Sequence, residues 1–238
     1  MPGFRGFPEE TIPFFRDLKK NNNREWFQPR KELFEAKVRA PMVDLVEALN
    51  AWLSAEAPEF VTEPGKAIYR IYRDTRFSKD KTPYKDHIGA IFPHKHLGKH
   101  SGGGFYVGIT DTGAGVAGGV YGPTPQDMLV LRTRFAEASA EFDRLTRGKT
   151  FAKLMGELKG EQLARMPKGF PTDHPAGDLL RRKQWYWYAE MNENPKLIES
   201  AKLLGEITKR FAAALPAVRW MNEPLVAAVK KAESRVML

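Results

Sequence analysis

The sequence predicts an α+β protein with a mainly antiparallel sheet of about five strands, packed against helices from both ends of the chain. Apolar residues recur at helical spacing toward both ends of the 238-residue chain and at alternating positions between residues 67 and 121. The connections between the alternating stretches are too short for the crossovers that parallel strands require. Because no repeat or linker interrupts the chain, we expect a single domain over residues 1–238.

The N-terminal third is predicted to be helical. Thr11 is placed to cap a first short helix, and the asparagines at 21–23 end it because Asn tolerates left-handed backbone conformations. Asn23 is placed to cap the element that follows. A longer helical pattern covers residues 29–53, where Pro41 predicts a kink or two abutting helices.

Strands are predicted from the alternating patterns in the middle of the chain. They cover residues 67–73, 86–92, 104–110 and 115–121, and residues 184–189 are a candidate fifth strand. Residues 113–118 spell the glycine-rich dinucleotide fingerprint, but that motif needs a helix directly after it. The sequence that follows, Gly-Val-Tyr-Gly-Pro, cannot begin a helix. We therefore interpret these glycines as part of a β-hairpin.

Two further helices are predicted in the C-terminal half. Thr124 and Asp127 have the spacing of a capped helix start, which predicts a helix over residues 125–142. An Asn-Pro pair opens a second predicted helix over residues 195–215, and Pro216 is expected to stop or bend it.

The composition excludes several classes of protein. Cysteine is absent, which excludes disulfides, thiolate zinc sites and cysteine nucleophiles. Charged residues interrupt the apolar N-terminus, so no signal-peptide core is present, and no uncharged apolar run reaches the roughly 20 residues that span a bilayer. We therefore expect a cytoplasmic protein that does not enter membranes and carries no cofactor.

The basic charge is concentrated in one region. The net charge of +9 predicts a polyanionic partner, such as nucleic acid or a phosphorylated ligand. Residues 66–100 contain nine Lys or Arg and three Asp, so 9 − 3 gives +6. The histidines at 94, 96 and 100 lie in this region, but two lysines among them oppose a bound cation, and we expect no metal site.

Residues 70–85 carry the candidate site. Arg73 and Arg76 have planar forks suited to bidentate binding of phosphate or carboxylate. Asp74 and Asp80 can orient these arginines or cap backbone amides of a loop. The further polar candidates in the segment are Ser78, Lys81, Tyr84 and Lys85. Two interpretations stay open, an anion-binding site and an ordered loop held together by ion pairs.

A second unusual segment has the sequence Trp-Tyr-Trp-Tyr at residues 185–188. In a strand, the two tryptophans share one face and the two tyrosines share the other. Packing against helices explains one of these faces, while exposed rings could stack on bases. We interpret the segment as a core strand.

Four motifs occur along the chain in a characteristic order. They are Phe14-x-x-x-Leu18 with Asn21-Asn22-Asn23-x-x-Trp26-Phe27, then Arg70-x-x-Arg73-Asp74-x-Arg76-Phe77-Ser78-x-Asp80-Lys81-x-Pro83-Tyr84-Lys85, then Gly104-Phe105-Tyr106, and then Gly118-Gly119-x-Tyr121. Through these motifs, residues 7–215 resemble the family named domain of unknown function 2461, which occurs in bacteria and fungi. The resemblance implies no particular activity.

Two functional hypotheses follow from these observations. In the first, the protein is a binding module whose residues 70–85 hold a phosphate-bearing ligand or nucleic acid. In the second, it is an uncharacterised, hydrolase-like enzyme in which Asp74, Asp80 and Lys81 act as acids and bases beside the two arginines. No known catalytic constellation is recognisable in the sequence, which favours the binding module.

Overall fold

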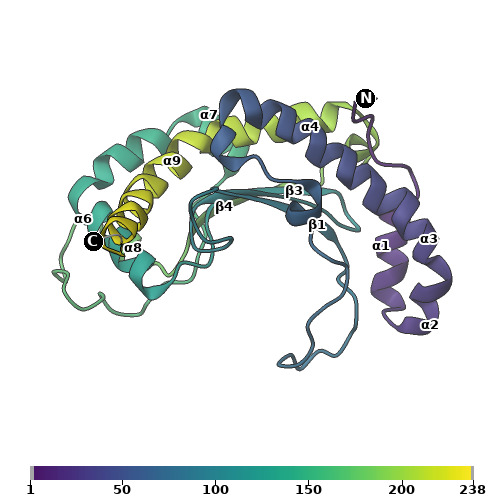
Figure 1. Ribbon diagram of the computed structural model, residues 1–238, viewed down its shortest axis with the longest axis horizontal. Coiled ribbons are helices and arrows are strands. Elements are labelled where there is room, and N and C mark those ends of the chain that lie inside the picture. The colour runs from purple at the N-terminus through teal and green to yellow at the C-terminus, as the bar shows by residue number, and fades with distance from the viewer. Residues whose placement is uncertain (1–2, 237–238) are drawn as a thin grey trace.

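The computed structural model describes residues 3–236. Its helices form an arched layer over one face of a central sheet, and the other face stays open beneath the arch (Figure 1). The principal elements are α1 (Thr11–Lys20), α2 (Arg24–Phe27), α3 (Lys31–Phe34), α4 (Ala40–Glu56), α5 (Pro64–Ala67), β1 (Ile88–Pro93), β2 (Gly104–Ile109), β3 (Ala114–Val120), α6 (Pro125–Thr146), α7 (Lys149–Met155), α8 (Gly177–Leu180), β4 (Trp185–Met191) and α9 (Lys202–Val236).

The sheet has four antiparallel strands in the order β1-β2-β3-β4. This confirms the α+β class and the glycine-rich hairpin, whereas the expected number of about five strands is too high. The register places Tyr106 between Ile91 of β1 and Ala117 of β3, and it pairs Ala117 with Tyr188 of β4. These four residues form one row across the sheet.

The strand predicted over residues 67–73 is wrong. In the described chain this segment makes only isolated bridges. The Tyr69 amide donates to the Gly89 carbonyl at 2.9 Å, after which the chain leaves β1 and pairs with its own returning half through Tyr72 and Tyr84. The side chains of residues 67–73 therefore alternate in burial, as the sequence pattern indicates, but the backbone of this segment forms no continuous ladder of hydrogen bonds.

The covered face of the sheet packs against the helices. Phe105 of β2 lies 4.6 Å, between ring centroids, from Phe211 of α9. At the β4 edge, Trp185 and Trp187 are buried, and Trp185 stacks on Phe135 of α6 at 5.4 Å. The core packing predicted for the aromatic strand is confirmed for its tryptophans. Its tyrosines point to the open face.

The predicted end of the last helix at residue 215 is wrong, because α9 continues through Pro216 and Pro224. Its predicted start is occupied by a separate 3-10 turn, Pro195–Glu199. A proline inside a helix costs about 3 kcal/mol. Burial of a long apolar face that includes Phe211 and Val218 outweighs this cost.

The N-terminal predictions are met in part. Thr11 begins α1 and does not cap it, because its hydroxyl donates to the Lys37 carbonyl at 2.8 Å. Asn23 caps α2 as predicted, accepting a backbone hydrogen bond at 2.9 Å. The irregularity expected at Pro41 lies just before it, in a π-helical turn over Glu35–Arg39 that joins α3 to α4.

The capped start predicted for α6 is confirmed. The Asp127 amide donates to the Thr124 hydroxyl at 3.2 Å, and the Asp127 carboxylate accepts from the Thr124 amide at 3.1 Å.

Within residues 3–236, no helix combines the length and the apolarity needed to cross a bilayer.

Candidate ligand-binding site

The open face of the sheet carries a pocket of about 400 Å³. Ile91, Tyr106 and Ala117 form its floor, because strand alternation directs their side chains away from the helices. The walls come from segments far apart in the sequence and include Tyr69, Lys99, His100, Tyr121, Lys159, Tyr186 and Tyr188. A concave, mainly apolar surface with a few polar groups is typical of a small-molecule site.

Tyr106 lies flat on the sheet. A Cβ atom added at Gly89 would come within 2.4 Å of the Tyr106 hydroxyl, and one at Gly108 would come within 2.5 Å. These two glycines pair across β1 and β2. One Cε atom of the ring approaches Gly89 and the other approaches Gly108. The ring plane is therefore parallel to the sheet, and its outer face is directed into the pocket.

Tyr188 lies beside Tyr106 in a similar way. A Cβ atom added at Gly115 would come within 2.1 Å of its hydroxyl. Burial raises the pKa of Tyr106 well above its usual range, and burial followed by the charge of Glu190 raises the pKa of Tyr188. Both phenols are therefore neutral at physiological pH and offer hydroxyl groups and aromatic faces.

Aromatic rings also line both edges of the pocket. At the β1 edge, Tyr69 stacks on His100 with ring centroids 6.1 Å apart and an interplanar angle of 8°. At the β4 edge, Tyr121 and Tyr186 meet edge to face at 5.1 Å. Burial, and then the charge of Lys99, lower the pKa of His100, so this imidazole is neutral at physiological pH.

Three lysines surround these rings. The Nζ atoms of Lys85 and Lys99 each lie 4.9 Å from the centroid of Tyr69, and Lys159 Nζ lies 5.4 Å from that of Tyr188. Burial lowers the pKa of Lys85, and the nearby cations lower it further. Positive charge beside an apolar pocket attracts an anion more strongly than it would in bulk water, because the local dielectric constant is lower.

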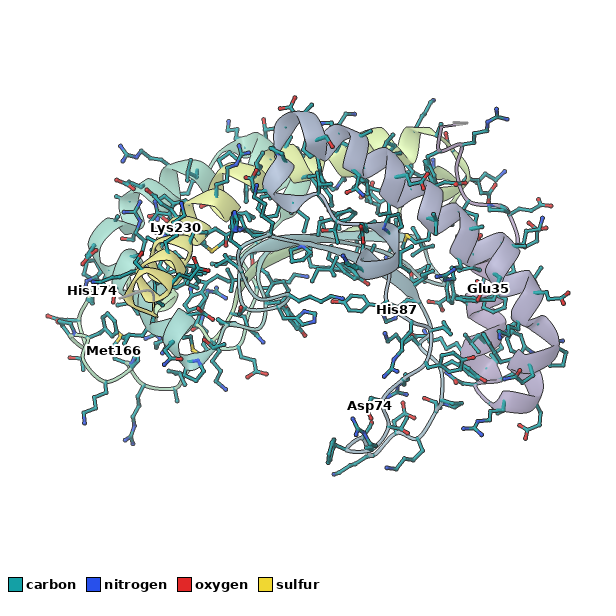
Figure 2. All side chains as sticks on the ribbon, viewed as in Figure 1. Glu35, Asp74, His87, Met166, His174 and Lys230 are labelled. Atoms are coloured by element: carbon teal, nitrogen blue, oxygen red, sulfur yellow. The ribbon has the colours of Figure 1, made fainter. Side chains whose placement is uncertain are left out.

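Residues 70–85, which we call the basic arm, project from the sheet. Figure 2 shows Asp74 on the projecting part of the arm and His87 where the chain has returned to the sheet. Arg76 binds Asp74 through two hydrogen bonds of 3.0 and 2.7 Å, and Arg73 donates to Asp80 and Thr82. The structure thus brings four of the predicted site residues together as two ion pairs within the arm.

Hydrogen bonds within the arm, including those of the two ion pairs, lower the pKa of both carboxyl groups. The hydrogen bonds from Arg76 lower the pKa of Asp74 to about 2. The backbone amide of Thr82, and then the side chain of Arg73, lower the pKa of Asp80 to about 2. Both groups are ionised at neutral pH and are weak bases, since an effective acid or base has a pKa near the working pH.

The other predicted residues of the arm have separate roles. Lys81 donates to a backbone carbonyl within the arm at 2.9 Å. Tyr84 is buried and stacks on a phenylalanine of α2 at 4.1 Å. Ser78 is partly buried near the tip. Lys85 lies beside the pocket, where it contacts a lining tyrosine, and it therefore connects the predicted site with the pocket.

Sequence reasoning missed the central residues of the pocket, Tyr69, Tyr106, Lys99 and Lys159. The available signal was the alternation of tyrosine with tryptophan in β4, because a strand with one aromatic face in the core presents its other face elsewhere. The partners on β1 and β2 could not be assigned to that face without the register of the sheet.

The clustered histidines have different surroundings. His94 packs edge-on against Phe60 at 5.5 Å, whereas His100 stacks on Tyr69. Among residues 3–236, no three His, Cys, Asp or Glu side chains lie where they could hold a metal ion.

The fold and the pocket define a class of protein, an open-faced antiparallel α+β protein with an aromatic, lysine-flanked pocket on the uncovered side of its sheet. Residues 10–220 match the family model of the conserved hypothetical proteins DUF2461. The chain belongs to this family, as the resemblance of its motifs indicated. No curated protein and no solved structure matches it.

Proposed function

We propose that the protein is a binding module whose open sheet face holds a phosphate-bearing ligand with a planar ring, of the nucleotide class. The observation that carries this proposal is the flat ring of Tyr106, whose outer face forms the floor of the pocket. Aromatic faces stack on bases with about 1–3 kcal/mol per base. A pocket of about 400 Å³ lies within the range of small-ligand sites.

The charges support an anionic ligand. Lys99 and Lys159 line the pocket, and Lys85 lies beside it. In contrast, Arg73 and Arg76 of the basic arm already bind carboxylates of the arm. We therefore assign direct phosphate contacts to the lysines and a supporting electrostatic field to the arm. The enzyme hypothesis gains no support, because Asp74 and Asp80 have pKa values of about 2.

Calorimetric titration with uridine 5′-monophosphate and adenosine 5′-monophosphate at low salt tests the proposal. We expect both nucleotides to bind, and uridine without its phosphate to bind more weakly. Lys99→Ala with Lys159→Ala should weaken nucleotide binding at least about tenfold, since each charge-assisted contact contributes about 1.5–3 kcal/mol. Both lysines are exposed, so the variant should fold normally.

The matched control is Lys149→Ala with Lys153→Ala, which removes the same charge from exposed positions of α7 in the helical layer. This control should bind as the unchanged protein does. An equal loss of nucleotide affinity in both double variants would show that net charge alone governs binding. Absence of nucleotide binding by the unchanged protein at low salt would overturn the proposal.

A further inference from the structure

The tip of the basic arm carries an unusually exposed aromatic ring. Phe77 is 94% exposed, whereas the next most exposed large apolar side chain of the described residues, Tyr121, is 61% exposed. At this exposure nearly all of the Phe77 ring surface is free to contact a partner, and covering it would remove apolar surface from water. The Arg76 guanidinium lies 5.7 Å from the centroid of the Phe77 ring.

The arm holds this ring in a defined place. Its two halves are joined by backbone hydrogen bonds from Arg73 to Pro83 at 2.9 Å and from Lys85 to Ile71 at 2.8 Å. Farther out, two Arg–Asp pairs join residues on the way to the tip. At the base, Asn22 of the α1–α2 connection exchanges hydrogen bonds of 2.9 and 3.0 Å with the backbone of the arm. The ring is thus presented by an ordered support.

The arm and the pocket lie on the same side of the molecule. Figure 1 shows residues 70–85 projecting below the open face of the sheet, away from the helical layer. The arm begins directly after Tyr69, which lines the pocket. It contains six basic and two acidic side chains, so 6 − 2 gives +4. An anionic polymer that leaves the pocket toward the β1 edge therefore meets positive charge and then Phe77.

We propose that Phe77 is a second stacking residue and that the ligand of the open face is a single-stranded nucleic acid that extends from the pocket to the arm. This inference rests on the proposed function and names the ligand class. Two separate stacking surfaces require unpaired bases, which a duplex does not present. Aromatic rings along a basic surface are the usual means of binding single strands without strong sequence preference.

The length of the arm sets the expected length of the ligand. Phe77 is eight residues after Tyr69, which corresponds to at most about 26 Å at roughly 3.3 Å per residue. At about 3.4 Å per nucleotide along one stacked strand, about eight nucleotides cover this distance. Affinity should therefore rise with oligonucleotide length and reach a plateau at or below about eight nucleotides.

Fluorescence anisotropy with labelled oligouridylates, from a dinucleotide to about twelve nucleotides, tests the inference. We expect Phe77→Ala to weaken binding of the longest oligouridylate about five- to 150-fold, the range for loss of one stacked base. Binding of uridine 5′-monophosphate should not change. The dependence of affinity on salt should keep its slope, because no phosphate contact is removed. Phe77→Trp should retain binding.

The matched control is Leu129→Ala on α6, which removes another exposed apolar side chain, 58% exposed, from the helical layer. It should leave all affinities unchanged. If Phe77→Ala binds the longest oligouridylate as the unchanged protein does, the inference is overturned. A protein that binds the mononucleotide without any gain for longer oligouridylates also overturns it, while the proposed function stands. If the unchanged protein binds neither probe, both proposals fail together.

Discussion

Replacement of Gly89 by alanine tests the flat placement of Tyr106, on which the proposed function depends. Gly89 has no positive φ, so alanine is compatible with its backbone and the constraint is one of space. The new Cβ would lie 2.4 Å from the Tyr106 hydroxyl, whereas ordinary contact begins at 3.4 Å, a deficit of 1.0 Å. On the other side the hydroxyl already lies close to the backbone of Gly108 of β2, 2.5 Å from the position that a Cβ would take there, which leaves little room for sideways movement. The ring must therefore lift into the pocket.

The expected change in stability is small and the expected change in affinity is large. Overpacking costs about 1–3 kcal/mol, and the lower chain entropy of alanine offsets about 0.5–1 kcal/mol. A net loss near 1 kcal/mol corresponds to a fall in Tm of about 2–4 °C for a chain of this size. The lifted ring occupies ligand volume and no longer offers a stacking surface, so nucleotide affinity should fall about five- to 150-fold.

The assay combines thermal denaturation with calorimetric titration of uridine 5′-monophosphate. Gly205→Ala in α9 is the control, because a Cβ atom there meets nothing within 4 Å. It should stabilise the protein by about 0.5–1 kcal/mol and leave affinity unchanged. Tyr106→Leu removes the ring without crowding and should reproduce the loss of binding. If Gly89→Ala is folded and binds the nucleotide normally, Tyr106 is not the stacking floor.

Two further predictions concern the sheet and the arm. Gly119→Ala should destabilise the protein by more than about 3 kcal/mol in chemical denaturation, because Gly119 has a φ of +130° and its Cβ would lie 2.3 Å from the Trp185 carbonyl; a loss below about 1 kcal/mol would contradict the geometry. The Asp74 carboxyl should titrate near pH 2 by NMR, and Arg76→Ala should return its pKa toward about 3.9. Because the pKa of Asp74 is lowered in the folded protein, the Asp74–Arg76 pair stabilises the arm above about pH 4, and this stabilisation is lost as the pH falls toward 2. If the midpoint of the Asp74 titration is the same in Arg76→Ala, the pair does not hold the arm.

Local patterns in the sequence were sufficient for most of the fold. The predicted strands over 86–92, 104–110 and 115–121 correspond to β1, β2 and β3, and the candidate strand over 184–189 corresponds to β4. The antiparallel order of β1, β2 and β3 followed from short connections, which are a local property. The place of β4 beside β3 did not, because α6, α7 and α8 lie between these two strands in the chain. The segment over 67–73 failed because side-chain alternation reports burial and cannot report which backbone supplies the hydrogen bonds.

The last helix failed for a different physical reason. A proline is a strong local signal against helix, so Pro216 was expected to stop or bend the helix, and the predicted range ended at residue 215. In the folded protein the residues on both sides of Pro216 are buried against the sheet and α6, including Leu215 and Ala217. Tertiary burial of this kind is contributed by residues far away in the chain, and no local window contains it.

The candidate site depends on register, and this is why the basic arm was more visible in the sequence than the pocket. The arm is one continuous segment whose charges can be counted, whereas the floor of the pocket combines residues from β1, β2 and β3. Gly89, Gly108 and Gly115 resemble turn or hairpin glycines when each is read alone. Once the register pairs Gly89 with Gly108 and Gly108 with Gly115, they form a row without side chains, and the rings of Tyr106 and Tyr188 lie across it. The signal for a flat aromatic floor is therefore a tyrosine two residues before a glycine in one strand, where that glycine pairs with glycines in both neighbouring strands. This signal is visible only once the register of the strands is known, so the hypothesis of a ligand-binding pocket depends on the strand pairing and not on the sequence of any one strand.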